Sequence, residues 1–339
     1  MKSVSMRDIG KELGVSAVTV SKALAGRSGV SDEMREKIVK RAEEMGYRYD
    51  LSAHPVGVER KDVGILVPDR FMEPGTSFYA SMCKKLVAQL AARRSSGMLE
   101  ILSDSEERRL VFPSVLSLER IGGLIILGQL SREYMQMLER SNLKVPYICL
   151  DFYDERSDAD SIVSDGVYGT YRLTSHLIHM GHTRIGFLGS IKATSSIMDR
   201  YLGYYRSMLS HDLPINEDWI MPDRNEKGEL IPAVLPEGGL TAVVCNCDRV
   251  AASLIRQLGK SGLKVPEDVS VVGFDNYYEY PCEPALTTYA VDQDMMARTA
   301  AEQIEGKMRG IPVRGGRIVT VGKIVYRDSV KDLKPARAR

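Results

Sequence analysis

Apolar residues recur at helical spacing near the start of the chain, at Ile9, Leu13, Val20 and Leu24. This spacing predicts two short amphipathic helices. Ser5 followed by Asp8 resembles a capping box, and Gly14 suits the left-handed residue that closes a helix. Ser16 is expected to cap the second helix, because its side-chain oxygen can accept an unpaired backbone N–H. The pattern predicts a helix, a tight turn and a helix.

A third amphipathic segment, 31–45, follows after a short connection. We expect it to close a three-helix core with the apolar side chains of Ile38, Val39, Ala42 and Met45. In a helix-turn-helix, the first residues of the second helix meet base edges in the major groove. Ala17 and Val18 are small and apolar, so they suit thymine methyl groups. The predicted DNA contacts here are Ser16, Ala17, Val18, Thr19, Ser21, Lys22 and Ser31, and a plain helical bundle remains an alternative reading.

From Val63 onward, short apolar runs alternate with helical stretches. The runs are VGILVP, MLEILS, GLIILG, VPYICLD, RIGFLGS, TAVVCN and VSVVGFD. We expect helices between them near 79–93, 106–119, 133–141, 168–180, 198–209 and 249–260. This alternation predicts parallel sheets with right-handed crossovers, in two doubly wound lobes with a cleft between them.

Ligands of open parallel sheets bind beyond the carboxyl ends of the strands. The residues that follow the apolar runs are therefore candidates for a binding site, and they include Gln129, Asp151, Asn246, Cys247 and Asp275. Carboxylates and an amide suit a neutral ligand rich in hydroxyl groups, and Tyr79 or Phe78 could stack on an apolar sugar face. Each acid taken singly could equally be a solvated loop residue or a helix cap.

The chain resembles the LacI/GalR (lactose-repressor) family. The most specific matches at the N-terminal end are VSAVTVSKAL (15–24) and REKI with MGY (35–47). Further along, HLIHMGHTRIGFLGS (176–190), DRYLGYYRSM (199–208), VPEDVSVVGFDN (265–276) and PALTTYAVDQDMMARTAAEQI (284–304) are similar to its effector-binding core. The resemblance implies an all-α helix-turn-helix headpiece and an α/β core of two doubly wound parallel-sheet lobes, of the periplasmic-binding-protein-like type I.

The resemblance also implies a domain plan and further site residues. The headpiece is expected at 1–49, the hinge linker at 50–61, the core at 62–330 and a tail at 331–339. One lobe combines 62–162 with 293–322, and the other combines 163–292 with 323–330. Arg200, in an R-x-x-G-[YFW] pattern, and Asp275 are the leading effector contacts, followed by Asp151 and Ser196. A homodimer is implied as well.

The linker departs from the family pattern. Asp50, Ala53 and Val56 stand where family members carry an Asn, an Ala and a leucine that wedges into the minor groove. Ala53 and Val56 are therefore further predicted DNA contacts. Pro55, one residue before the wedge, would cost a hinge helix roughly 3 kcal/mol. We expect a shorter or non-helical hinge.

Composition narrows the class of protein. The chain has 44% hydrophobic and 27% charged residues, and no apolar run has the length of a membrane span. No secretory signal is visible, so we expect a cytoplasmic location. Five scattered cysteines argue against a disulfide framework. Through Lys61 there are 12 Lys and Arg against 9 Asp and Glu, a surplus placed where DNA would bind.

Catalytic motifs are not found. There is no GxxxxGK[ST] phosphate loop, no G-x-G-x-x-G after a strand and no G-x-S-x-G elbow, so we expect neither an enzyme nor a cofactor. The histidines of HMGH have no evident carboxylate or thiol partner, so no metal is expected. The favoured interpretation is a sequence-specific DNA-binding repressor, whose operator affinity is controlled by a sugar or sugar derivative bound in the cleft. A cytoplasmic sugar-binding protein without strong operator binding is the alternative.

Overall fold

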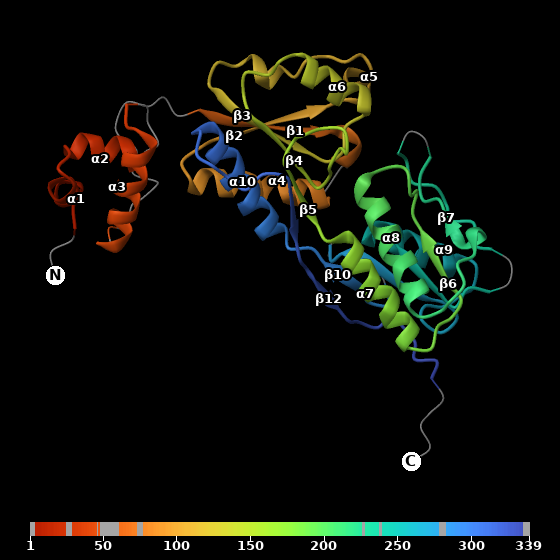
Figure 1. Ribbon diagram of the computed structural model, residues 1–339. Coiled ribbons are helices and arrows are strands. Elements are labelled where there is room, and N and C mark those ends of the chain that lie inside the picture. Colours follow the sequence, from red (N-terminus) through yellow and green to blue (C-terminus); the bar gives the residue numbers. More distant parts are fainter. Residues whose placement is uncertain are drawn as a thin grey trace. The chain divides into compact units, whose positions relative to one another are not determined.

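The computed structural model describes residues 4–24, 29–45, 47, 61–72, 77–225, 228–236, 239–277 and 283–334. The chain forms two compact units, one of residues 1–60 with 306–313 and one of residues 61–305 with 314–339 (Figure 1). We call the first unit the headpiece and the second the core.

The headpiece contains the predicted helix, turn and helix. They are α1 (Met6–Leu13) and α2 (Ala17–Leu24), followed by α3 (Asp32–Glu44). The Asp8 carboxylate accepts hydrogen bonds from the backbone N–H (2.8 Å) and the hydroxyl (2.6 Å) of Ser5. Gly14 has φ 67° and ends α1, and the Ser16 hydroxyl accepts the Thr19 N–H at 3.0 Å. The local capping signals in the sequence therefore set both ends of the turn.

The headpiece core consists of Ile9, Val20, Ala23, Ile38 and Ala42, which are all buried. The prediction that Val39 also belongs to this core is wrong, because its side chain is 38% exposed. Gly10 has a role that the sequence did not reveal. A Cβ atom there would lie 2.6 Å from the carbonyl oxygen of Val15, so only glycine lets the turn pack against α1.

Each lobe of the core is built on a six-stranded sheet. In the first, strands run in the order β11-β5-β4-β3-β1-β2, and all neighbouring strands are parallel. The bounds are β1 (Asp62–Pro68), β2 (Gly97–Leu102), β3 (Ile121–Leu127), β4 (Tyr147–Leu150), β5 (Ser161–Ser164) and β11 (Arg317–Thr320). Neither β5 nor β11 corresponds to one of the predicted apolar runs.

The second sheet has the order β12-β10-β9-β8-β6-β7, with β12 antiparallel to β10 and the other pairs parallel. The bounds are β6 (Ile185–Leu188), β7 (Ile220–Met221), β8 (Ala242–Cys245), β9 (Ser270–Asp275), β10 (Thr287–Ala290) and β12 (Lys323–Val325). Strand orders that place later strands beside earlier ones require crossover connections, which are the mark of doubly wound folds. The predicted fold class is confirmed.

Helices connect these strands. They are α4 (Phe78–Ala92), α5 (Asp104–Arg108), α6 (Arg132–Arg140), α7 (Gly166–His179), α8 (Ser195–Ser210), α9 (Asp248–Lys260) and α10 (Gln293–Met308), with short 3-10 turns η1 (Asp69–Phe71), η2 (Ser114–Ser117) and η3 (Glu217–Trp219). The expected helix at 106–119 is wrong. Pro113 interrupts it, since proline cannot donate a backbone hydrogen bond within a helix, and only α5 and η2 form.

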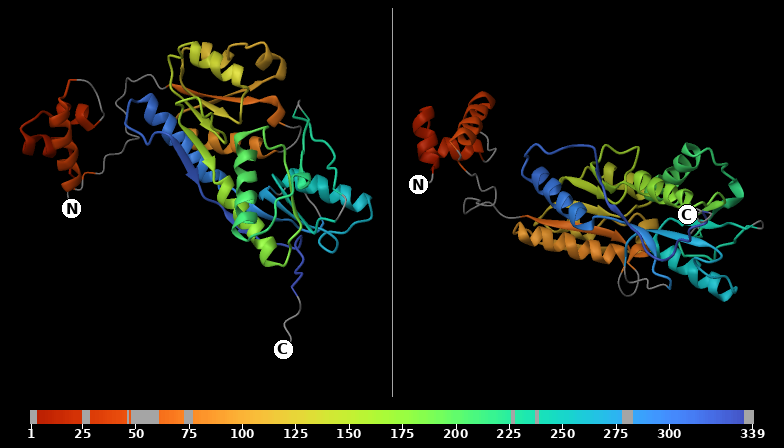
Figure 2. Two further views of the ribbon diagram at one scale, coloured as in Figure 1. Left: turned by 45° about the vertical axis from the view of Figure 1, so that its right-hand side comes forward. Right: turned by 90° about the horizontal axis from the view of Figure 1, so that it is seen from below.

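The chain passes between the two lobes three times, after β5, after β10 and after β11. These connections lie side by side (Figure 1, Figure 2). The Asp165 N–H donates to the Thr320 carbonyl at 2.9 Å, and the Gly322 N–H donates to the Tyr289 hydroxyl at 2.7 Å. The two lobes are therefore joined by three adjacent connections.

Helices α7 and α8 pack unusually closely. A Cβ atom on Gly203 would lie 2.3 Å from the Val167 carbonyl oxygen. One turn further along, the hydroxyls of Ser175 and Ser207 are 2.9 Å apart and hydrogen-bonded. Arg200 precedes Gly203 by three residues, so this packing also fixes the position of Arg200.

We predict that Gly203→Ala destabilises the core by roughly 1–3 kcal/mol, because the new methyl group overlaps backbone that cannot move freely. Urea unfolding of the full chain should show a lower midpoint with an unchanged slope. Gly259→Ala in α9 is the matched control. A Cβ atom there meets nothing within 4 Å, so we expect a gain of up to about 1 kcal/mol. Equal stability of the two variants would contradict the close packing.

Candidate functional site

A cavity of about 510 Å³ lies between the two lobes of the core. Carboxyl ends of strands meet N-termini of helices there, since Asp151 follows β4, Asn246 follows β8 and Thr194 caps α8. Seven of the predicted effector-binding residues line it, namely Tyr79, Asp151, Ser196, Arg200, Asn246, Cys247 and Asp275. Residues from distant parts of the chain therefore share one enclosed space.

Arg200 is the most deeply buried cation of this cavity, with 5% of its surface exposed. Its Nη1 donates to the Asn246 carbonyl at 2.6 Å, and its Nη2 donates to Asp275 Oδ1 at 3.1 Å. Its guanidinium carbon lies 4.1 Å from the centre of the Phe274 ring. Burial alone would lower the pKa of Arg200, but the charges of Asp275 and Asp151 raise it. Nε is buried and has no hydrogen-bond partner among the described residues.

Asp151 offers an acceptor on the opposite lobe. Tyr79 donates its hydroxyl to Asp151 Oδ2 at 2.8 Å, whereas Oδ1 is buried and has no hydrogen-bond partner among the residues that the structure describes. Burial raises the pKa of Asp151. Asp151 and Asp275 both have positive φ angles, 66° and 111°. Such backbone conformations cost of order 1–3 kcal/mol each and concentrate at functional sites. They mark this cavity as a candidate binding site.

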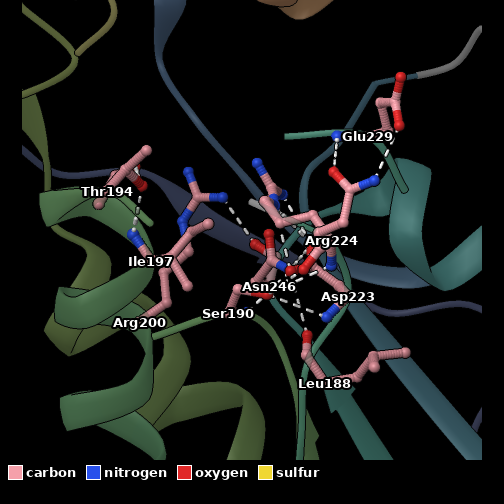
Figure 3. Close-up of polar contacts among 11 residues, drawn as sticks. Leu188, Ser190, Thr194, Ile197, Arg200, Asp223, Arg224, Glu229 and Asn246 are labelled. Atoms are coloured by element: carbon pink, nitrogen blue, oxygen red, sulfur yellow. Dashed lines mark hydrogen bonds and ion pairs between the residues drawn. The ribbon is translucent and has the colours of Figure 1, made fainter. Parts of the chain in front are cut away.

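A polar network supports one wall of the cavity (Figure 3). Asp223 is buried and accepts hydrogen bonds from the Ser190 N–H at 2.7 Å and from Asn246 Nδ2 at 2.8 Å. Arg224 donates Nη2 to Asp223 Oδ2 at 2.6 Å. Burial by itself would raise the pKa of Asp223, but the hydrogen bonds from Arg224 and Asn246 lower it. The carboxylate therefore stays ionised and holds Arg224 at the cavity.

The roles expected of Asn246 and Cys247 need refinement. The Asn246 amide is committed within the protein, because Nδ2 donates to both the Leu188 carbonyl and Asp223. Cys247 caps α9 and lines the cavity, and burial raises the pKa of its thiol to about 12. A thiol of this kind offers a ligand a weakly polar contact and is a poor nucleophile at neutral pH.

Gln129 does not line the cavity, contrary to the expectation from its position after β3. Its side-chain Oε1 instead accepts the Ser195 N–H at 2.7 Å. Close by, the Tyr153 hydroxyl donates to Asp199 Oδ1 at 2.9 Å. Both bonds connect the first lobe to the start of α8 in the second. The position of Gln129 after a strand predicted the correct edge of the sheet, but it did not predict the direction of this side chain.

Six of the seven predicted DNA contacts of the headpiece lie in α2 or directly before it, and Ser31 lies directly before α3. Ser16, Lys22 and Ser31 are exposed, and Val18 is 64% exposed, while Ala17, Thr19 and Ser21 are half-buried. Arg35, which the sequence analysis did not select, donates Nη1 to the Ala23 carbonyl at 3.0 Å. This bond connects α3 to the C-terminal end of α2. The hinge prediction, with Ala53, Pro55 and Val56, lies outside the described residues.

Several cavity residues escaped the sequence analysis. Arg70 is held by Glu107, whose carboxylate also accepts the Ser131 N–H. Both side chains line the cavity, as does Arg224. Arg70 and Arg224 stand in connections that follow strands, a signal that could have been used. Glu107 lies inside a helix that was placed wrongly.

Two further features were sought among the described residues. No group of three or more His, Cys, Asp or Glu side chains there is arranged to hold a metal ion. His182 is buried, and its Nε2 is 3.1 Å from the Lys331 carbonyl oxygen. No helix in the described ranges is long and apolar enough to cross a membrane.

Comparisons with known proteins agree with both units. A model of the family described as "Bacterial regulatory proteins, lacI family" matches residues 5–50, and a model of the periplasmic binding protein-like domain matches residues 174–330. The chain is 28% identical over 340 residues to the HTH-type transcriptional repressor PurR of Vibrio campbellii (strain ATCC BAA-1116), covering 97% of this chain and 99% of that protein.

Two solved structures share the fold over almost the whole chain. The complex of the transcriptional regulator CelR with cellobiose has a TM-score of 0.68 at 22% identity, covering 96% of this chain and 99% of that one. The lac repressor dimer bound to operator and the anti-inducer ONPF has a TM-score of 0.63 at 21% identity, covering 97% and 100%. At these identities the likeness concerns the fold.

A helix-turn-helix headpiece joined to a two-lobed core with a polar cavity defines a class of DNA-binding regulators with a periplasmic-binding-protein-like core. Within that class, residues 5–50 belong to a helix-turn-helix domain of the lacI family of bacterial regulatory proteins, and residues 174–330 belong to a periplasmic binding protein-like domain.

We predict that Tyr79→Phe destabilises the core by roughly 1–3 kcal/mol, because Asp151 loses its one hydrogen-bond donor among the described residues. Folding raises the pKa of Asp151. The free energy of unfolding therefore falls as the pH rises above the pKa that this carboxyl has in the unfolded chain. Removing a donor that favours the ionised form makes this fall larger. Urea unfolding should therefore show a larger loss at pH 8 than at pH 5.

Tyr205→Phe is the control for this prediction. Tyr205 is 39% exposed, and its hydroxyl makes no hydrogen bond with the described residues. We expect its stability to equal that of the unmodified chain at both pH values. A Tyr79→Phe effect independent of pH would show that Asp151 is not the group responsible.

Proposed function

We propose that the protein is a transcriptional repressor that binds a near-palindromic operator as a homodimer and responds to a small-molecule effector, a sugar or sugar derivative. The observation that carries the proposal is a pair of buried polar atoms on residues that line the cavity, Asp151 Oδ1 and Arg200 Nε, neither of which has a hydrogen-bond partner in the described part of the chain. An unpaired buried acceptor or donor costs roughly 1–3 kcal/mol, so a ligand that pairs both gains that energy. A sugar hydroxyl can donate to one and accept from the other.

The headpiece supports the DNA-binding part of the proposal. Val18 is a large apolar residue at the start of α2, and 64% of its surface is exposed. No described residue of the headpiece covers it. In the major groove, an apolar side chain at this position would contact thymine methyl groups. Lys22 follows one turn later and suits a phosphate. Relatives named as repressors, such as PurR of Vibrio campbellii, support the direction of control.

The surface of the first lobe supports the homodimer. Leu99 and Ile101 lie on one face of β2, an edge strand, and are 45% and 48% exposed. The segment Leu110–Phe112 adds further exposed apolar side chains. Exposed apolar residues on an unpaired edge favour association with another chain. The lac repressor structure, whose fold this chain shares, is a dimer bound to operator.

We predict that the full chain binds a palindromic duplex from its own promoter region and that one sugar of a panel changes this affinity. Fluorescence anisotropy at fixed salt measures both, since affinity for DNA depends steeply on ionic strength. Asp275→Asn should retain operator binding but lose the response, because Arg200 loses its ionised partner and the ligand loses an acceptor. Relief of binding by a sugar would identify an inducer, and binding only with a sugar would identify a co-repressor.

No specific DNA binding, with or without any sugar, would contradict the repressor proposal. It would favour a sugar-binding protein that has lost its operator contact. Loss of DNA binding together with a normal sugar affinity in Asp275→Asn would contradict the site assignment.

We predict that Ile101→Lys converts the dimer to a monomer, because it places a charge on the apolar edge of the first lobe. Sedimentation velocity gives the mass, and operator affinity should fall with it. Val234→Lys is the control, since Val234 is 82% exposed and lies outside this edge. A dimer that survives Ile101→Lys would move the interface elsewhere.

A further inference from the structure

Arg224 lines the cavity, yet the protein uses only part of its guanidinium group. Arg224 closely follows β7, and its side chain is 17% exposed. Its Nε lies 3.1 Å from each carboxylate oxygen of Asp223, and its Nη2 lies 2.6 Å from Oδ2. Nη1 has no hydrogen-bond partner among the described residues. One side of the guanidinium is therefore occupied and another is available.

The shape of the group gives the available atoms a direction. Nε and Nη2 form the side edge, which Asp223 occupies, and Nη1 and Nη2 form the end edge with two parallel N–H bonds. Such an edge matches two oxygen atoms of one carboxylate or phosphate group. A single hydroxyl of a neutral sugar would pair with only one of the two N–H bonds.

Asp223 holds this edge in place before any ligand arrives. The Asp223 side chain is 1% exposed, and it is fixed by the Ser190 N–H at 2.7 Å and by Asn246 Nδ2 at 2.8 Å. Figure 3 shows Arg224, Asp223, Asn246 and Ser190 joined in this network. A guanidinium that is already ordered loses little conformational entropy on binding, which favours tight and directional recognition.

The other charges of the cavity are compatible with an anion. Among the described lining residues every cation is an arginine: Arg70, Arg108, Arg200, Arg224 and Arg249. Arg108 pairs with Asp104 on the surface, where both side chains are more than half exposed, so this pair is weak. Burial raises the pKa of Asp151, which favours its uncharged form, and Asp275 is ion-paired with Arg200, so both repel an anionic ligand less than free carboxylates would.

We propose that the end edge of Arg224 binds a carboxylate or phosphate group of the effector, so that the effector is an acidic sugar. Asp151, Arg200 and Asp275 then contact its hydroxyl groups, and Arg224 selects its charge. The proposal rests on the proposed function, because it assigns a charge to the effector of the same cavity. It makes Arg224 a specificity-determining residue.

Isothermal titration calorimetry on the full chain tests this. The panel contains glucose and galactose, their uronic acids, gluconate and the hexose 6-phosphates, so that carboxylate and phosphate are distinguished. An acidic sugar should bind more tightly than its neutral parent. Arg224→Gln should reduce this preference by roughly 10- to 100-fold, the effect of losing hydrogen bonds to a charged group.

Three control variants separate charge recognition from folding. Arg108→Gln removes an exposed cation of the same cavity and should leave the preference within a few-fold. Asp223→Asn keeps Arg224 but weakens its support, so the preference should fall by less than in Arg224→Gln. The double variant Asp223→Asn with Arg224→Gln should lose the preference without leaving a buried carboxylate unpaired. Retained preference in the double variant, or absence of binding by every acid of the panel, overturns the proposal.

Operator binding, measured separately, distinguishes this failure from failure of the proposed function. If DNA binding responds only to a neutral sugar, the result supports the repressor assignment and contradicts the anion site. If an acidic sugar binds through Arg224 but no operator is bound, the result supports the anion site and contradicts the repressor assignment.

Discussion

Burial of the Arg200 charge is the constraint on which the binding core depends. A guanidinium removed from water costs several kcal/mol unless it is paired and hydrogen-bonded. Here Asp275, the Asn246 carbonyl and the Phe274 ring supply that compensation from three different positions. Each must sit at the carboxyl end of its strand, and Asp275 adopts φ 111° to do so. The close packing of Gly203 against α7 then brings Arg200 within reach of all three.

The helix that carries Arg200 also connects the lobes. Its first turn is bonded to the other lobe through Gln129 and Tyr153, only a few residues before the guanidinium. A ligand in the cavity therefore touches a helix whose attachment to the opposite lobe is a small set of hydrogen bonds. It can alter the arrangement of the lobes only by binding one arrangement more tightly than another. The three adjacent connections between the lobes are the place where the chain would bend if the arrangement of the lobes changed.

Features that depend on local sequence could be predicted, and features that depend on distant partners could not. The headpiece turn follows from Ser5, Gly14 and Ser16, which act within a few residues of each other. The two doubly wound lobes follow from the apolar runs, and most of the predicted cavity residues follow from their positions at the carboxyl ends of strands. The burial of Val39 was misjudged because spacing alone does not give the width of a buried face. Arg224 was missed because its importance comes from Asp223 and Asn246, which no periodic pattern links.

Polar atoms that lack hydrogen-bond partners among the described residues are the groups by which this cavity can discriminate between ligands. Asp223, Asn246 and Glu107 are satisfied inside the protein, so they shape the wall but offer a ligand little. Asp151 Oδ1 and Arg200 Nε have no partner among the described residues, and a ligand that lacks the matching donor or acceptor leaves them unpaired and desolvated. Sites of this kind reject an analogue that lacks one polar group far more strongly than apolar pockets reject one that lacks a methylene. Discrimination among ligands of similar size then depends on these atoms more than on the cavity volume of about 510 Å³.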